Sequence, residues 1–404
     1  MPAFQDHFTG RHYDAEHSTG PLKFLNPTNI YMIADKRNVG KDQQPPRPSG
    51  QAPRVAYVWR SRDNRKGRHA LVVAADSQKH EEIEGPKPTH TWDQTLRGMA
   101  KMMLRYPVWD VSYDVAIIFT FGSIIWVVNG FFSWLPVQAP STEFSGETDW
   151  ASGLTALVGA TIFEVGSVLL MLEAVNENRS DCFGWAVEES LGGGLHLRPE
   201  HDCNHSHSQK RTFVARKPPN ADHVEQRRGG KSGDGRTWSW WPTWYELRTH
   251  YFRDIGFLAC SSQMFGSTVF WISGFTALPP ILNNLSTPAA NGVYWLPQVI
   301  GGTGFIVSGT LFMIEVQPRW YVPAPGVLGW HIGLWNLIGA IGFTLCGALG
   351  FGIAQPGVEY ALTLSTFIGS WAFLIGSVVQ WFESLSKYPI WTDKRVGRLE
   401  RHLD

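Results

Sequence analysis

Six apolar blocks limit what this 404-residue chain can fold into more than any other feature of its sequence. Each block is about 22 to 25 residues long, nearly free of charge, and long enough to cross a bilayer as a helix, which takes about 20 residues. The blocks cover residues 112–135, 151–173, 254–278, 294–315, 328–350 and 361–383. We therefore predict an all-α polytopic membrane protein with six transmembrane helices, and the pattern excludes a simple soluble protein.

The positive charges predict how these helices are oriented. All Lys and Arg residues lie outside the six blocks and outside the connections 136–150, 279–293 and 351–360. Because Lys and Arg are retained on the cytoplasmic side, we expect an integral protein of the plasma membrane or an endomembrane with both termini cytoplasmic. No apolar run suited to a cleavable signal peptide occurs near residue 1. With 35 Lys and Arg against 35 Asp and Glu, the zero net charge excludes a strongly basic nucleic-acid-binding protein.

A repeated pattern pairs the blocks into three helical hairpins. The second helix of each hairpin carries Gly, then Phe four residues later, a pair of small residues, and finally Glu. The three copies read Gly159, Phe163, Gly166-Ser167, Glu173; Gly301, Phe305, Ser308-Gly309, Glu315; and Gly369, Phe373, Gly376-Ser377, Glu383. Small residues let membrane helices pack closely, so this spacing predicts three parallel repeats around an axis along the membrane normal.

The remaining segments complete the predicted organisation. Two short apolar runs at 55–59 and 69–75 favour a small β-hairpin whose basic turn, residues 61–68, could touch anionic lipid headgroups. The predicted regions are a polar cytoplasmic N-terminal region (1–90), an interfacial amphipathic helix (91–109), hairpin 1 (110–175), a largely disordered cytoplasmic loop (176–250), hairpin 2 (251–317), hairpin 3 (318–384) and a cytoplasmic tail (385–404).

Four carboxylates are candidates for binding or transport. Glu173, Glu315 and Glu383 end the three repeated helices on the cytoplasmic side. They are either interfacial carboxylates paired with nearby Lys or Arg, or a ring around the pseudo-threefold axis that attracts cations. Glu164 lies near the bilayer centre, where a charge is costly. It is either a proton or cation site, or a protonated side chain hydrogen-bonded to a neighbouring helix. Polar residues of the first helices that could assist it are Asn129, Gln263, His331 and Asn336.

Other motifs do not favour catalysis or a cofactor. His201, Cys203, His205 and His207 alternate in the central loop, but the second arm of a structural zinc site is missing, so we expect no specific metal site. The sequence contains no nucleophile elbow, zinc-protease helix or dinucleotide-binding glycine motif. We predict that the protein is not an enzyme and carries no cofactor.

The spans resemble the YrhK-like membrane proteins, which are small two-span hairpins. The likeness rests on Phe121-Gly122-Ser123 and Phe265-Gly266-Ser267 in the first helices, and on Phe163 to Ser167 and Phe373 to Ser377 in the second. It covers about a third of the chain, and the order Ser308-Gly309 departs from it. The resemblance implies a hairpin architecture and no particular activity.

Two functional hypotheses follow from these observations. The first is a non-enzymatic membrane scaffold or organising protein that lies in the lipid bilayer and recruits cytoplasmic protein partners through the loop at 176–236. The second is a small transporter or channel for a cation or proton that uses Glu164.

Overall fold

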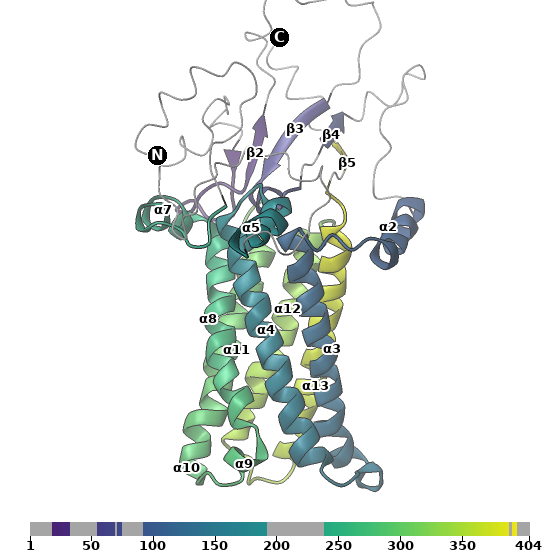
Figure 1. The fold of residues 1–404 in the computed structure, drawn as a ribbon, viewed down its shortest axis with the longest axis vertical. Coiled ribbons are helices and arrows are strands. Elements are labelled where there is room, and N and C mark those ends of the chain that lie inside the picture. The colour runs from purple at the N-terminus through teal and green to yellow at the C-terminus, as the bar shows by residue number, and fades with distance from the viewer. Residues whose placement is uncertain are drawn as a thin grey trace, which may run out of the picture.

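The computed structural model describes residues 18–32, 55–68, 71–74, 92–191, 238–387 and 390–393. Within these residues the protein is predominantly helical, with a small sheet at one end of a long helical bundle (Figure 1). We call this end of the bundle the sheet end and the opposite end the loop end.

Six helices are long and apolar enough to cross a membrane, which suggests a membrane location. The second span reaches 29 residues when the π-helical turn Glu147–Ala151 is included, and the fourth reaches 29 when the turn Asn291–Trp295 and the short helix Thr287–Ala290 are included. The six helices are α3 (Val111–Gln138), α4 (Ser152–Val175), α8 (Ile255–Thr276), α11 (Leu296–Glu315), α12 (Leu328–Gly350) and α13 (Val358–Ser384). Each helix packs mainly against the helices before and after it in this order, and α13 packs against α3, so the six form a closed ring.

The sequence accounts for where several of these helices begin. Asp110 precedes α3 and its carboxylate accepts a hydrogen bond from the Ser112 backbone. Asp254 does the same for α8, with Phe257 as the donor. Carboxylates at this position satisfy free N–H groups and interact favourably with the positive end of the helix dipole.

A five-stranded sheet covers the sheet end of the ring and departs from the prediction of an all-α protein. Its strands are β1 (Ser18–Thr19), β2 (Asn29–Met32), β3 (Val55–Arg60), β4 (Leu71–Ala74) and β5 (Ile390–Asp393), in that spatial order. The predicted hairpin is the antiparallel pair β3 and β4. The rest was not anticipated, because β5 pairs in parallel with β4 from more than 300 residues away and residues so far apart leave no local pattern.

Shorter helices flank the sheet end (Figure 1). They are α2 (Trp92–Leu104), α5 (Phe183–Ser190) and α7 (Trp244–Thr249), whereas α1 (Ser61–Arg65) connects β3 toward β4 and is mostly buried. Helix α2 exposes Trp92, Leu96, Met99 and Met103, and that these side chains lie on a membrane surface stays a prediction. Residues 192–237 of the predicted disordered loop lie outside the described residues. At the loop end, α9 (Pro279–Leu282) and α10 (Thr287–Ala290) connect α8 to α11.

Six aromatic rings, one from each spanning helix, fill the middle of the ring. We call them the aromatic layer; they are Trp126, Phe163, Phe270, Phe305, Phe343 and Phe373. Centroid separations between contacting members run from 4.9 Å for Trp126 and Phe343 to 6.4 Å for Trp126 and Phe163. The mostly edge-on geometry is the arrangement that aromatic quadrupoles prefer.

Glycines of the partner helix make room for these rings. A Cβ atom at Gly122 would lie 2.6 Å from the Phe163 ring, and one at Gly159 would lie 2.9 Å from Trp126. The other two helix pairs show the same reciprocal contacts, in which an aromatic residue of each helix lies against a glycine of the other. These contacts are Phe305 with Gly266, Phe270 with Gly301, Phe373 with Gly339 and Phe343 with Gly369. Small residues therefore set the close approach of helices that lipid alone does not drive together.

Candidate functional site at the sheet end of the helix ring

Glu173, Glu315 and Glu383 lie together inside the sheet end of the ring. They stand near or at the ends of α4, α11 and α13, and their exposed fractions are 0%, 2% and 2%. Three buried carboxylates need compensating charges, because an isolated ion in a low-dielectric interior is strongly disfavoured.

The compensating charges come from residues 61–68, which we call the basic segment. This segment connects β3 to β4 and includes α1. Arg65 makes a two-pronged contact with Glu315: Nη1 donates to Oε1 at 2.8 Å and Nη2 donates to Oε2 at 2.9 Å. Ser61 Oγ donates to the same carboxylate at 3.0 Å. The planar guanidinium matches a carboxylate in this geometry, so Glu315 is fully engaged.

Glu383 is bound by two guanidinium groups. Arg62 Nη2 donates to Oε2 at 2.7 Å, and Arg68 Nη1 donates to Oε1 at 2.9 Å. Arg68 also contacts Asp63 at 3.0 Å and donates to the Ser386 carbonyl. Residues more than 300 positions apart are thus joined by buried ion pairs.

Glu173 is held less tightly. Lys66 Nζ lies 3.4 Å from its Oε1, and Arg65 Nε lies 3.7 Å from the same atom. Both carboxylate oxygens are buried and lack hydrogen-bond partners among the described residues. Charge-assisted hydrogen bonds are normally about 2.7–2.9 Å long, so Glu173 and Lys66 attract each other without completing a bond.

Burial and these carboxylates act in opposite directions on the basic side chains. Burial by itself disfavours the charged form, but Glu383 outweighs it at Arg62 and Glu315 outweighs it at Arg65, so the pKa of each guanidinium is raised. At Lys66 burial dominates over the attraction of Glu173, and the pKa of the ammonium is lowered.

The backbone of the basic segment fits its binding place closely. Gly67 has φ of 58°, and a Cβ there would lie 2.5 Å from Ser180 Oγ. On the ring side, a Cβ at Gly256 would lie 1.6 Å from Arg65 Nη1, and one at Gly329 would lie 2.5 Å from Arg62 Nε. Two glycines near the starts of α8 and α12 therefore leave the space that the guanidinium groups occupy.

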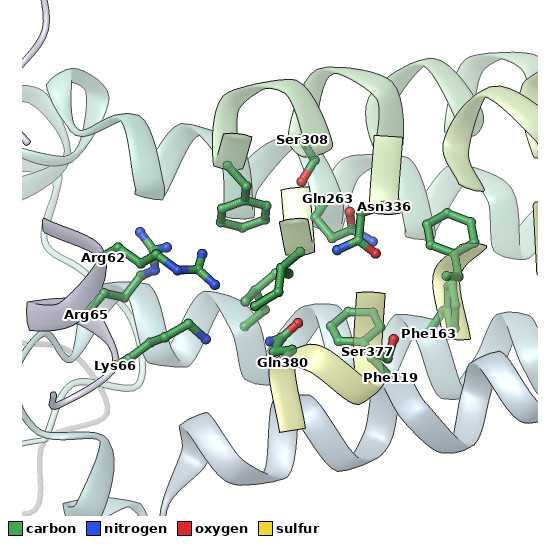
Figure 2. Close-up of a pocket in the computed structure, with 14 residues that line it drawn as sticks. Arg62, Arg65, Lys66, Phe119, Phe163, Gln263, Ser308, Asn336, Ser377 and Gln380 are labelled. Carbon is green, nitrogen blue, oxygen red and sulfur yellow. The ribbon is translucent and has the colours of Figure 1, made fainter. Parts of the chain in front are cut away.

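A cavity with a mixed polar and apolar wall lies on the axis between the basic segment and the aromatic layer. Figure 2 shows Arg62, Arg65 and Lys66 on one side of it and Phe163 on the other. Between them its polar lining comes from four different helices: Gln263 (α8), Ser308 (α11), Asn336 (α12), and Ser377 and Gln380 (α13). The cavity has a volume of about 30 Å³, about twice what one water molecule needs.

Several polar groups around the cavity have no partner. Ser308 Oγ is buried and makes no hydrogen bond. The amides of Gln263, Asn336 and Gln380 also make none among the described residues. Such groups point to something polar inside the cavity, because native structures rarely leave buried polar groups unsatisfied.

The structure places Glu164 elsewhere. Its oxygens accept hydrogen bonds from Ser267 and Thr268 on the neighbouring helix α8, at 2.5 and 2.9 Å. Thr268 is exposed on the outer surface of the ring, and Glu164 is not among the described residues that line the cavity. It therefore does not come together with Glu173, Glu315 and Glu383. Of the suggested helpers of Glu164, Gln263 and Asn336 line the cavity, whereas Asn129 donates hydrogen bonds to α4 and His331 contacts the Pro325 carbonyl.

Metal binding gains no support from the part of the chain that the structure describes. No group of three or more His, Cys, Asp or Glu side chains there could hold a metal ion. His201, Cys203, His205 and His207 fall outside the described residues, so the expectation about them stays a prediction.

Comparisons with protein-family models, curated proteins and solved structures find no match to this chain. The resemblance to YrhK-like hairpins therefore stays a prediction.

The sequence pattern did not identify the basic segment as the partner of the three carboxylates; it favoured contact between this turn and lipid headgroups. The structure buries Arg62, Arg65, Lys66 and Arg68 to exposed fractions of 6% or less. The sequence nevertheless contains a signal for this pairing. Four cations lie within eight residues between two short apolar runs, and three Glu residues near the ends of the spanning helices require counter-ions.

Proposed function

We propose that this protein is a membrane transport protein whose solute pathway follows the axis of the helix ring and is closed at the sheet end by the basic segment. The observation that carries this proposal is the polar cavity directly behind the basic segment. A ring that served packing alone would gain nothing from unpartnered amides facing its axis, since such groups are costly at membrane depth. Polar side chains inside a helical bundle typically mark a solute or ion pathway.

The basic segment has the properties of a closure. It is connected to β3 and β4 and is not part of a spanning helix, so it can leave the axis without breaking the ring. Its four cations face four carboxylates, Asp63, Glu173, Glu315 and Glu383. Neutral pairing keeps the closed form stable, and the loose contact between Lys66 and Glu173 is the weakest part of it.

We further propose that the ring consists of three repeated hairpins with the sheet end in the cytoplasm. The reciprocal contacts between rings and glycines within each helix pair support the repeat. The confinement of Lys and Arg to the termini, the central loop and one short connection supports the orientation. In this arrangement the pathway follows the axis and does not use Glu164.

Solute entry into proteoliposomes tests the transport proposal. Gly329→Ala places a methyl group against Arg62 and should displace the basic segment, whereas Gly326→Ala, three residues earlier, meets nothing within 4 Å. After a hyperosmotic step with salts or polyols, we expect faster swelling by light scattering with Gly329→Ala than with wild type. Gly326→Ala and Glu164→Gln should match wild type.

Two results would contradict the proposal. If correctly folded Gly329→Ala protein, judged by size-exclusion chromatography, gives the swelling rate of protein-free liposomes for every solute, the axial pathway is wrong. If Glu164→Gln alone changes the rate, the pathway lies at the interface of α4 and α8 instead.

A scaffold is the second candidate, and the aromatic layer favours it. Six mutually contacting rings fill the axis beyond the cavity, as a purely structural core would. In that case partners would bind the loop at 176–236, and a variant lacking this loop would lose the proteins that co-purify with wild type. Full retention of those proteins would count against a scaffold that uses this loop.

A further inference from the structure

The charge of the cavity wall is one-sided. Among the described residues that line it, Arg62, Arg65 and Lys66 are cationic and none is a carboxylate. Glu173, Glu315 and Glu383 bind the cations from other directions and do not form part of the wall. A solute in the cavity therefore meets cationic side chains, of which Arg62 and Arg65 are already paired with Glu383 and Glu315 and Lys66 is the least engaged.

Hydrogen-bond donors remain available on this wall. The Lys66 ammonium has three donors, and its one ion pair, with Glu173, is 3.4 Å long. Opposite it, the amide groups of Gln263, Asn336 and Gln380 can each turn an N–H toward the centre, and the buried hydroxyl of Ser308 can donate as well. Donors from the basic segment and from four spanning helices thus line the same cavity (Figure 2).

The size of the cavity limits the ligand. A volume of about 30 Å³ suits an ion of a few atoms and is too small for a nucleotide, a sugar or an amino acid. The aromatic layer supplies an apolar floor through Phe163 and Phe373, which favours a weakly hydrated monovalent ion over a strongly hydrated one.

We propose that this cavity is a binding site for a small monovalent inorganic anion, held by Lys66 and the amides of Gln263, Asn336 and Gln380. The inference rests on the proposed function only in naming the anion as a transported solute. Binding itself can be measured without flux.

Thermal unfolding of the purified full-length protein in detergent tests the site. Intrinsic tryptophan fluorescence is recorded while sodium nitrate replaces sodium gluconate at constant ionic strength; gluconate is too large for the cavity. We expect a saturable rise in Tm with nitrate. Gln380→Leu and Asn336→Leu, which keep the approximate volume and remove the donors, should raise the half-saturating nitrate concentration at least tenfold.

Gln298→Leu is the matched control. Gln298 is also a buried amide on a spanning helix but is not part of the cavity wall. The substitution should lower Tm at every nitrate concentration and leave the half-saturating concentration unchanged.

Each outcome bears on the proposal. A nitrate effect that does not saturate, or that is the same in all four proteins, is a general salt effect and would overturn it. A saturable effect of potassium against sodium at fixed nitrate, abolished by Gln380→Leu, would replace the anion by a cation. Saturable nitrate binding without nitrate entry into proteoliposomes would leave the site in place and refute only transport.

Discussion

The axis of the helix ring is built in two different ways along its length. In the middle, the aromatic layer uses side chains of the spanning helices alone, and each ring fits against a glycine of its partner helix. At the sheet end, three helix-ending carboxylates are satisfied by a segment from outside the ring. The aromatic layer is formed by the spanning helices alone, whereas the three carboxylates at the sheet end depend on the basic segment, which is not part of a spanning helix.

This difference indicates where the molecule can change state. Packed rings resist rearrangement, because interiors are close-packed. Buried ion pairs contribute little net stability over an apolar replacement, yet they are costly to break on one side only. Under the proposed function, the sheet end is therefore the first part of the axis to change, with the basic segment bound or absent, and the aromatic rings must then separate for a solute to cross.

Breaking one ion pair should have the largest effect on stability. Arg65→Met leaves Glu315 buried without its partner and should lower the free energy of unfolding by about 3–5 kcal/mol. Unfolding is followed by SDS titration in mixed micelles. The double variant Arg65→Met with Glu315→Leu should recover most of the loss, because no unpaired charge remains.

Arg97→Met provides the matched control. Arg97 pairs with Asp93 on α2, where both side chains are 66% exposed. Exposed pairs contribute about 0–1 kcal/mol, so a loss as large as that of Arg65→Met would show that the burial of the pair is not the cause.

Overpacking the aromatic layer should have the next largest effect. A Cβ at Gly266 would lie 2.7 Å from the Gly301 carbonyl and 3.0 Å from Phe305, so Gly266→Ala should cost about 1–3 kcal/mol in the same titration. Gly292→Ala meets nothing within 4 Å and should be neutral. Equal values for the two variants would contradict the role given to glycine.

The pH dependence of stability should show a smaller effect at the start of α8. Burial, followed by the nearby Glu177 charge, raises the pKa of Asp254 to about 6. The folded state then binds this proton more tightly than the unfolded state, so the contribution of Asp254 to stability is greatest below about pH 4 and is lost as the pH rises through 6. We expect the free energy of unfolding to decrease by on the order of 1 kcal/mol. The effect is limited because Glu177 and His250 form an ion pair nearby and their charges act on Asp254 in opposite directions.

Asp254→Asn isolates this contribution. Asparagine still caps the helix but does not titrate, so Tm measured from pH 4 to pH 7 should decline less than in wild type. An identical decline in both proteins would assign the titration to another group.

Glu164 should give the smallest effect of all. Its oxygens accept hydrogen bonds from Ser267 and Thr268, and a glutamine can accept at least one of them. Glu164→Gln should change the free energy of unfolding by about 1 kcal/mol or less and should leave the half-saturating nitrate concentration unchanged. A large loss of nitrate binding would mean that the interface of α4 and α8 communicates with the cavity.

The spanning helices could be predicted from the sequence because the signal for them is local. Length and the absence of charge define them, and the expected boundaries lie within about seven residues of those in the structure. The fit of Phe163 against a small residue of a neighbouring helix was also foreseeable, because a bulky ring near small residues in a membrane helix needs a complementary gap. For Glu164 the sequence left two alternatives open, a proton or cation site or a hydrogen bond to a neighbouring helix, and its hydrogen-bond donors Ser267 and Thr268 were not among the helpers named.

The partners of Glu173, Glu315 and Glu383 could not be predicted because they are remote. Arg62 and Glu383 are 321 residues apart, and no local sequence pattern around either residue predicts contact with the other. The position of a Glu within a spanning helix predicts that its carboxylate lies near the end of the membrane span. It does not predict which polar segment of the chain packs against that carboxylate. The same reason explains why β5 was missed, since a short strand is recognisable only beside its neighbour β4.

The pairing of Arg62 and Arg68 with Glu383 also fixes an order of events during synthesis of the chain. At about 5–20 residues per second, a ribosome needs roughly 16 to 64 s to travel from Arg62 to Glu383. Throughout that interval the two arginines exist without their carboxylate, and a sequence separation this large makes their encounter slow. The ion pairs that close the sheet end therefore cannot all form until the last spanning helix has been made.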